Sequence, residues 1–160
     1  MTGGTIQWWY NVNTATLLMN GKVLVAGGAT DGDHLPTGAE LFDSSTGTFT
    51  ATGSMIMGHV GHTATLLPDG AVLLAGSFFL LDSLATVELY DPVKGESTAT
   101  SAMFTARSEG LTATLLNDGQ VLVTGGYSPY PGITSNAELY RPIVLVPAPE
   151  LFSLSGDGRG

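Results

Sequence analysis

The stretch that decides the fold is HTATLLPDGAVLLAGS, residues 62–77, because the chain contains two further versions of it. One is NTATLLMNGKVLVAGG, residues 13–28, and the other is LTATLLNDGQVLVTGG, residues 111–126. Their shared TATLL motif recurs every 49 residues. Identity at a fixed period of this length is typical of tandem structural units that stack on one another.

Each unit begins with the pattern of a β-hairpin. TATLL is a β-branched and apolar run of strand length, and an Asn-Gly or Asp-Gly pair follows it in every copy, at residues 20–21, 69–70 and 118–119. Such pairs tolerate positive φ, which makes them a strong hairpin signal. The runs that come next, KVLVAGG, AVLLAGS and QVLVTGG, are apolar almost throughout. This is the pattern of a strand that is covered on both faces.

A second set of motifs completes each unit. AELFD begins at Ala39, VELYD at Val87 and AELYR at Ala137, and each predicts a third strand. TGTFTATGSM, from Thr46, predicts a fourth strand after a Ser-Thr-Gly turn. No segment shows sustained helical periodicity. The sequence therefore predicts an all-β fold of four-stranded antiparallel blades, as in a β-propeller.

On these motifs the chain resembles kelch repeats, in the form found in galactose-oxidase-like propellers, over about residues 5–142. The residues that match the kelch double glycine are Gly27, Gly28, Gly125 and Gly126, and those that match its third-strand aromatic are Phe42, Tyr90 and Tyr140. The middle copy departs from the double glycine with Gly76 and Ser77. We expect the second strand to end at glycine because neighbouring blades crowd there and leave no room for a side chain.

The repeats divide the chain into three predicted blades, which together with a leading strand span residues 1–142. The predicted boundaries are 13–55 for blade 1, 62–104 for blade 2 and 111–142 for blade 3, which lacks its last strand. Residues 1–12 resemble a stray outer strand that completes a blade, and residues 143–160 form a Pro/Gly-rich linker or tail.

Three blades are too few for a ring, since propellers have about four to eight. An open set of blades leaves apolar faces and strand edges uncovered. We therefore expect the ring to be completed by another copy of the chain, which gives six blades, or by further blades of a longer polypeptide. An open helical array is a third alternative.

Composition excludes several classes of partner and chemistry. The formal net charge is -9, from 14 acidic and 5 basic residues, which disfavours nucleic acid as a partner. The chain has no cysteine, which excludes disulfides, thiolate metal sites and thiol nucleophiles. No apolar run is long enough to span a membrane. The resemblance to bacterial secreted kelch proteins favours an extracellular or cell-surface location, with a cytoplasmic one as the alternative.

Histidines and acids were assessed as metal ligands. His59 and His62 stand three apart, which places them on opposite faces of an extended strand, so packing is favoured over shared metal ligation. Asp31, Asp33 and His34 share one loop, where spaced acids could hold calcium, but a solvated turn is favoured because the loop has too few ligands. Galactose oxidase carries a copper site with a Tyr–Cys cross-link, and this chain has no cysteine to form it. No metal, cofactor or catalytic residue is predicted.

Three glutamates recur inside the predicted third strands, at Glu40, Glu88 and Glu138. A repeated position favours a shared structural role over catalysis. In related repeats an arginine precedes the first strand, and Arg107 matches it, whereas Gly58 stands at the corresponding place in the second copy. We expect a single ion pair, between Arg107 and either Glu88 or Glu138, that helps to join the blades.

The copies differ most in the loops that emerge on one face, and such loops carry function on many scaffolds. The candidate binding residues of this loop face are Asp31, Asp33, His34, Phe78, Phe79, Arg107, Tyr127 and Tyr130. Exposed aromatic side chains suit stacking on sugar rings or protein contacts, although packing between blades is an equal alternative for Phe78 and its neighbours.

The sequence thus predicts a non-enzymatic binding or assembly module that self-associates. The alternatives are the propeller part of a secreted carbohydrate-active or carbohydrate-binding protein, with its catalytic part elsewhere, and a cytoplasmic adaptor.

Overall fold

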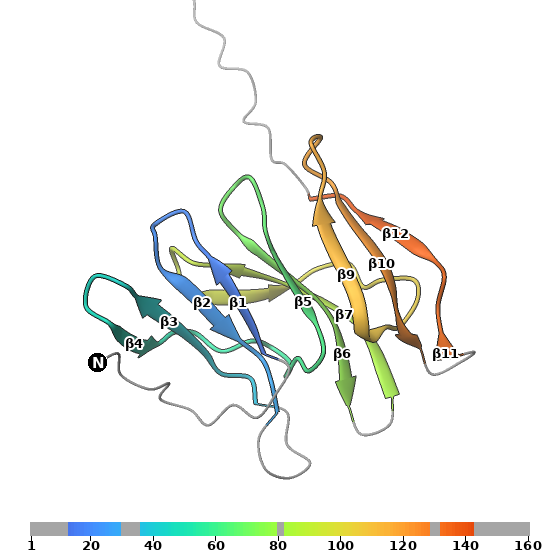
Figure 1. Cartoon of the computed structure of the whole chain (residues 1–160), viewed down its shortest axis with the longest axis horizontal. Coiled ribbons are helices and arrows are strands. Elements are labelled where there is room, and N and C mark those ends of the chain that lie inside the picture. Colours follow the sequence, from blue (N-terminus) through green and yellow to red (C-terminus); the bar gives the residue numbers. More distant parts are fainter. Residues whose placement is uncertain (1–12, 30–35, 80–81, 129–131, 143–160) are drawn as a thin grey trace, which may run out of the picture.

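The computed structural model describes residues 13–29, 36–79, 82–128 and 132–142. These residues form twelve β-strands and no helix, in three antiparallel sheets (Figure 1). The predicted all-β fold of antiparallel blades is therefore confirmed, and the three blades do not close into a ring. Within the described ranges no helix is long and apolar enough to cross a membrane.

The first two blades have the same strand order. Blade 1 has the order β1-β2-β3-β4, with bounds β1 (Thr14–Leu17), β2 (Val23–Ala26), β3 (Ala39–Asp43) and β4 (Thr48–Ala51). Blade 2 has the order β5-β6-β7-β8, with bounds β5 (Thr63–Leu66), β6 (Val72–Phe79), β7 (Asp82–Asp91) and β8 (Glu96–Ala99). Each strand pairs antiparallel with the one that follows it in the sequence.

Blade 3 differs at its outer edge. Its strands are β9 (Ser108–Leu115), β10 (Val121–Ser128), β11 (Gly132–Ile133) and β12 (Ala137–Tyr140). The fourth strand of this sheet is the two-residue β11, which pairs with the end of β10 and not with β12. In the part of the chain that the structure describes, no strand pairs with the outer edge of β12. The predicted outer strand in residues 1–12 and the tail 143–160 lie outside the described residues.

The Asn-Gly and Asp-Gly pairs form the predicted hairpin turns between the first and second strands. In blade 1 the N–H of Lys22 donates to Oδ1 of Asn20 (3.1 Å), and Gly21 has a φ of +81°. The same side-chain bond recurs at 3.1 Å from Ala71 to Asp69 and from Gln120 to Asp118. The repeated turn fixes the register in which TATLL meets the following apolar run.

One predicted loop is a strand pair. Phe78 and Phe79 were predicted to lie in a variable loop, but β6 continues to Phe79 and β7 begins at Asp82. Phe78 pairs with Ser83 across this extension. The prediction failed because the apolar run does not end at its glycine: a register shift between Ala75 and Ser77 absorbs Gly76, and pairing resumes beyond it.

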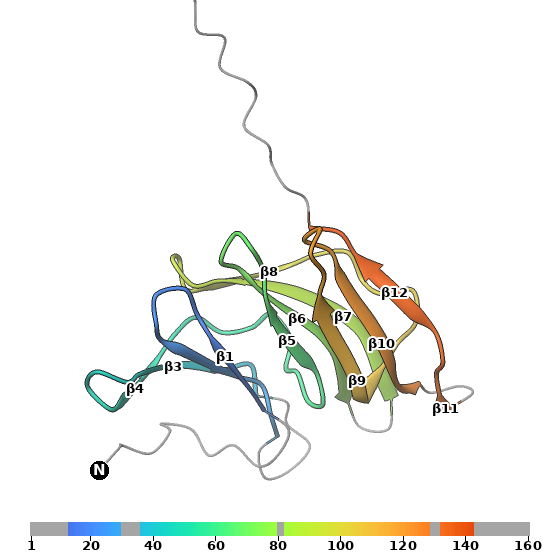
Figure 2. The same cartoon turned by 45° about the horizontal axis from the view of Figure 1, so that its top comes forward.

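The blades converge at their first strands. β1 contacts β5, and β5 contacts β9, so the first strands are innermost and the sheets fan outward from them (Figure 1 and Figure 2). Two apolar clusters fill the wedges between the blades. The first joins Leu24 of β2 to Leu74 of β6, and the second joins Leu73 of β6 to Val123 of β10. Consecutive residues of β6 therefore pack on different blades, which explains why its sequence is apolar on both faces.

The structure confirms the predicted crowding at these glycines, but only β2 ends there: β6 continues past its glycine to Phe79, and β10 continues to Ser128. Gly27 has a φ of +70°, and a Cβ built there would overlap the carbonyl oxygen of His59 and the ring of His62. Both histidines lie in the link, residues 52–62, that carries the chain from β4 to β5. Gly27 is thus the point where the backbone of blade 1 meets the beginning of blade 2.

Replacing this glycine tests the crowding. Gly27→Ala is expected to lose about 1–2 kcal/mol from its positive φ and a further ~1–3 kcal/mol or more from overpacking. Gly21→Ala is the matched control, because its φ is +81° and nothing lies within 4 Å of the added Cβ. Urea unfolding followed by circular dichroism measures both. Equal losses in the two variants would contradict the close approach of the blades.

Candidate functional site

Glu138 anchors the link that carries the chain from blade 2 into blade 3. Its Oε2 accepts a hydrogen bond from the N–H of Phe104 (2.6 Å), and its Oε1 accepts one from the N–H of Thr105 (3.0 Å). Nη2 of Arg107 donates to the same Oε1 at 2.7 Å, and the Arg107 side chain is fully buried. Nη1 of Arg107 also donates to the carbonyl oxygens of Gly125 and Asn136, at 3.0 Å each. The predicted ion pair is confirmed, and Glu138 is its carboxylate.

Glu88 makes the equivalent contacts in blade 2. Its Oε2 accepts from the N–H of Ile56 (2.9 Å), and its Oε1 accepts from the N–H of Met57 (2.8 Å). Nε2 of His59 lies 3.1 Å from Oε1, and Nδ1 lies 2.7 Å from the carbonyl oxygen of Gly76. His59 thus contacts the glutamate and the glycine carbonyl oxygen of blade 2 as Arg107 contacts Glu138 and the carbonyl oxygen of Gly125 in blade 3.

Sequence reasoning found the partner of Arg107 but did not find that His59 contacts Glu88 in the equivalent way. Counting back from TATLL aligns Gly58 with Arg107, but the link into blade 3 has one extra residue after the arginine. Counting forward from Met55 and Met103 aligns His59 with Arg107, which matches the observed contacts. We call each glutamate with its basic partner, Glu138 with Arg107 and Glu88 with His59, a clamp. The repeated methionine was the signal in the sequence that could have predicted the second clamp.

Both clamp glutamates are ionised. Burial works to raise the pKa of Glu88, but the hydrogen bonds from His59, Ile56 and Met57 outweigh it, so the pKa lies below its ordinary value. Burial likewise opposes the backbone bonds and the Arg107 guanidinium at Glu138, and the pKa of Glu138 is also lowered. Glu40 has the same strand position in blade 1 and is buried as well. The repeated glutamate is thus a structural anchor, as the sequence predicted.

His59 and His62 lie together, although the strand pattern predicted opposite faces. Their ring centroids are 5.5 Å apart, because the link bends at Gly61, where φ is +63°. His62 is buried, and its Nε2 shares a hydrogen bond of 2.8 Å with Oγ1 of Thr14 in blade 1. Burial and the neighbouring His59 lower the pKa of His62 to about 3, so the ring is neutral at pH 7. Among the described residues no group of three metal-ligating side chains occurs.

Four of the eight candidate residues of the loop face lie in the part of the chain that the structure describes. Tyr127, at the end of β10, is 45% exposed, and Phe78 is half-buried on β6, with Phe79 following it. Arg107 is fully buried against Glu138 and does not present its guanidinium on this face. Asp31, Asp33, His34 and Tyr130 lie outside the described residues.

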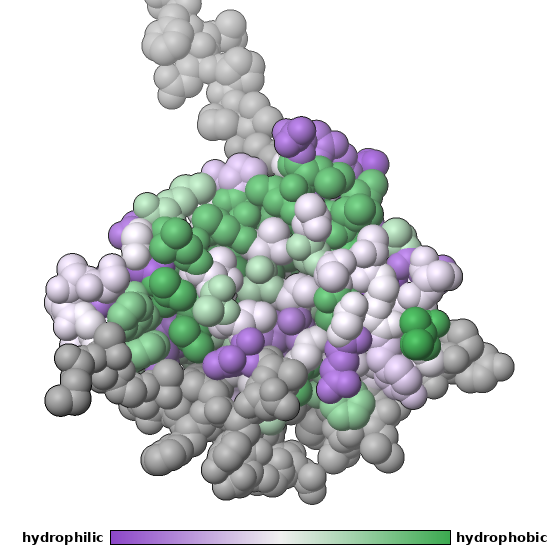
Figure 3. Space-filling view, in the orientation of Figure 1, coloured by the Kyte–Doolittle hydropathy of each residue, from purple (hydrophilic) through white to green (hydrophobic). Residues whose placement is uncertain are grey.

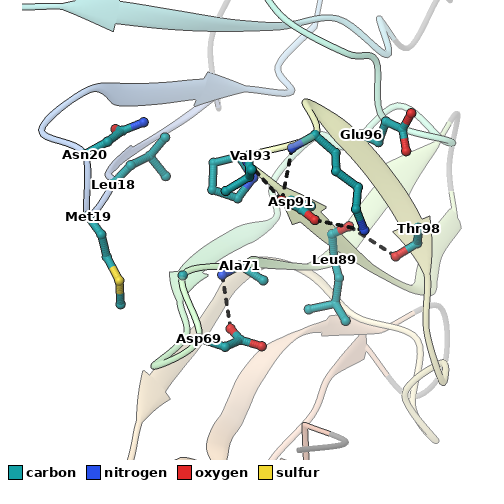
Figure 4. A pocket seen from close by; sticks show the side chains of 13 residues that line it. Leu18, Met19, Asn20, Asp69, Ala71, Leu89, Asp91, Val93, Glu96 and Thr98 are labelled. Carbon is teal, nitrogen blue, oxygen red and sulfur yellow. Dashed lines mark hydrogen bonds and ion pairs between the residues drawn. The ribbon is translucent and has the colours of Figure 1, made fainter. Parts of the chain in front are cut away.

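Sequence reasoning missed a groove at the hairpin-turn end of blades 1 and 2 (Figure 4). It has a volume of about 710 Å³ and lies between the turns that follow β1, β5 and β7. Its walls include Leu18, Met19, Leu89, Val93, Asp69 and Asp91. Lys94 forms an ion pair with Asp91 at 3.2 Å. The groove combines apolar walls with acidic groups, which suits an apolar side chain better than an anion.

The two end blades each leave one sheet face without a neighbouring blade. We call the side of blade 1 that points away from blade 2 the head face, and the side of blade 3 that points away from blade 2 the tail face. Strand alternation places Ala15, Leu17, Val23, Val25 and Phe42 on the head face, and Leu122, Thr124, Ala137 and Leu139 on the tail face. Leu17 is 63% exposed and Leu139 is 48% exposed.

More apolar surface lies along the innermost strands and their turns. Figure 3 shows apolar side chains gathered across the upper part of this side of the molecule, where Figure 1 places the ends of β5 and β9 and the beginning of β10. The exposed residues of the innermost strands and their turns include Leu17, Met19 and Leu115. Contiguous apolar surface of this kind marks sites of interaction.

The sequence matches no known protein-family model and no curated protein. The kelch resemblance therefore rests on the repeated motifs. The site that the described geometry favours is the pair of open faces, with the clamped links as the parts that hold them in place.

Removing the charge of one clamp tests its contribution. Glu138→Gln leaves the buried guanidinium of Arg107 without its counter-charge and is expected to lower the free energy of unfolding by about 3–5 kcal/mol. Asp91→Asn is the matched control, since it neutralises an exposed pair with Lys94 and should cost much less. Thermal and urea unfolding measure the two losses. A loss at Glu138 no larger than that of the control would rule out a structural clamp.

The low pKa of His62 predicts an acid-sensitive junction. Below pH 6.5 the unfolded chain binds a proton at this residue, whereas the folded chain does not until about pH 3. The stability from neutral His62 is thus complete above pH 6.5 and is lost as the pH falls toward 3. His62→Leu, the residue that blade 3 carries at Leu111, should reduce the slope of unfolding free energy with pH by up to about 1.4 kcal/mol per unit.

Urea unfolding at several pH values between 4 and 7 measures this slope. Thr14→Val is the control, because it removes the hydrogen bond to His62 without removing the titrating group. It should keep the wild-type slope. A slope that His62→Leu leaves unchanged would show that another group causes the acid sensitivity.

Proposed function

We propose that this chain is a non-enzymatic binding and assembly module, a run of three kelch-type propeller blades that works with further blades on its open faces. One observation carries the proposal. A position that is buried where two blades meet inside the chain, at Ala39 (3% exposed) and Val87 (4% exposed), is exposed at the end of the run, at Ala137. Exposed apolar sheet faces and edges are sites of association in soluble proteins.

The internal junctions show how much packing such a face makes when it is covered. Val72, Leu74 and Tyr90 of blade 2 are all 0% exposed against blade 1. Their counterparts on the head face are Val23, Val25 and Phe42, of which Val25 is buried and Val23 and Phe42 are only half-buried. Fully burying one such side chain contributes about 1.5–3 kcal/mol, so the uncovered head face forgoes part of this contribution at Val23 and Phe42.

The buried ionisable groups support a structural role. Glu88, His59, Glu138 and Arg107 bind one another and the backbone of the links. Their hydrogen bonds join the links to the blades, and none of these bonds points into a cavity. They belong to the scaffold that fixes the end faces.

A second candidate function is glycan binding in a secreted or cell-surface protein, on the loop face. Tyr127 favours it, because its ring is exposed at the end of β10, beside the short strand β11. Exposed tyrosine rings stack well on sugars. The open end faces favour assembly as the first candidate.

Solution mass tests the assembly function. The full chain is expected to sediment at more than the 16.5 kDa of one copy, and Leu139→Asp should weaken association at least tenfold while the circular dichroism of the sheets is kept. Val93→Asp is the control, because Val93 is 94% exposed on the turn after β7 and away from both end faces. A monodisperse 16.5 kDa monomer that unfolds cooperatively would contradict the proposed function.

A further inference from the structure

We propose that the tail face of blade 3 binds the head face of blade 1 in a second copy of this chain, so that two copies close a six-bladed ring. This inference rests on the proposed function and names the partner of the same open faces. The two junctions inside the chain show which residues cover which face.

Each internal junction joins a tail-type face to a head-type face. At the first, Leu24 and Ala39 of blade 1 pack with Val72 and Leu74 of blade 2. At the second, the equivalent positions of blade 2 pack with Val121 and Val123 of blade 3. The free tail face is therefore of the kind that accepts a head face, and blade 1 carries the one head face in the described chain that no blade covers. The two free faces of one chain type are complementary.

Gly125 marks a contact position on the tail face that no described blade fills. The equivalent glycines contact the next blade. A Cβ on Gly27 would overlap the backbone of His59, and one on Gly76 would lie 2.7 Å from the carbonyl oxygen of Arg107. Gly125 has a similar φ of +67°, but among the described residues a Cβ there would meet only the carbonyl oxygen of Gly110, at 3.5 Å. No described residue occupies the space that the next blade fills at the other two junctions.

A polar pair fits across the proposed junction. At the first internal junction Thr14 bonds His62 at 2.8 Å, and the repeat equivalents of these residues at the proposed junction are Thr112 and Asn13. Both Thr112 and Asn13 are exposed in the single chain. The amide of asparagine can exchange a hydrogen bond with a threonine hydroxyl. The contact seen at the first internal junction can therefore form again between two copies.

The third-strand aromatic of the head face, Phe42, favours blade 3 as its partner over a blade that has a fourth strand outside its third. Tyr90 bonds Thr52 of the preceding blade at 2.7 Å, and Tyr140 bonds Thr100 at 3.1 Å. Each threonine follows the fourth strand of its blade. Phe42 has no hydroxyl and needs no such partner. It matches blade 3, in which no described strand pairs outside β12.

Cross-linking tests the proposal, because the natural chain has no cysteine. Asn13→Cys and Thr112→Cys are made as separate variants, mixed, and treated with a short bis-maleimide. Head-to-tail association predicts a cross-linked dimer in the mixture and none in either variant alone. The double variant should give a closed dimer, whereas an open array would give a ladder of higher species and overturn the ring.

Two controls accompany this experiment. Ser45→Cys, in the exposed turn after β3, should give no product when mixed with Thr112→Cys. Gly125→Ala should weaken association at least tenfold by filling this contact position on the tail face, whereas Gly21→Ala, with a similar φ and open space, should not. Both glycine variants are first shown by circular dichroism to be folded.

The outcomes separate the inference from the function on which it rests. An assembly that cross-links only between copies of the same variant would overturn the head-to-tail contact and leave the assembly function standing. Monomers in every mixture would overturn both. Wild-type association by Gly125→Ala would overturn the assignment of the tail face.

Discussion

The structure depends on one constraint: each blade is a sheet whose two faces are both apolar, so each blade needs a neighbour on both sides. Strand β6 of blade 2 shows this most clearly, because Leu73 packs against blade 3 and the next residue, Leu74, packs against blade 1. A sheet with one solvated face could end a stack, but a sheet of this kind cannot. The middle blade meets the constraint inside the chain, and the two end blades do not.

Close approach at the glycines and the clamps at the links serve this constraint together. The glycines let the second strand of one blade meet the backbone of the next. The glutamates tie the connecting segment to the third strand of the blade that it leads into. Two different basic side chains, His59 and Arg107, complete the same arrangement. The use of unlike side chains at one position shows that the hydrogen bonds to the glutamate and to the glycine carbonyl oxygen matter more than the shape of the residue.

Much of the fold could be predicted from the sequence, because the repeat supplies its own check. The turn after TATLL fixes where each hairpin closes, and the apolar runs show that both faces are covered. The sequence narrowed the partner of Arg107 to two glutamates. It did not reveal the role of His59, because the links were aligned by counting back from TATLL and not also by counting forward from the repeated methionine. Phe78 was assigned to a loop because strand pairing beyond a bulge leaves no local signal. The groove beside Val93 depends on three turns that meet only in space.

The clamped links have a mechanical consequence. Glu88 and Glu138 each hold the connecting segment at two backbone N–H groups. These bonds restrict the rotation of one blade relative to the next about the link. If the links were hinges, the angle between blade 1 and blade 3 could change to fit any partner. Because the links are held, this angle is fixed, and a partner must present blades at the same angular spacing to fill the space between the head face and the tail face.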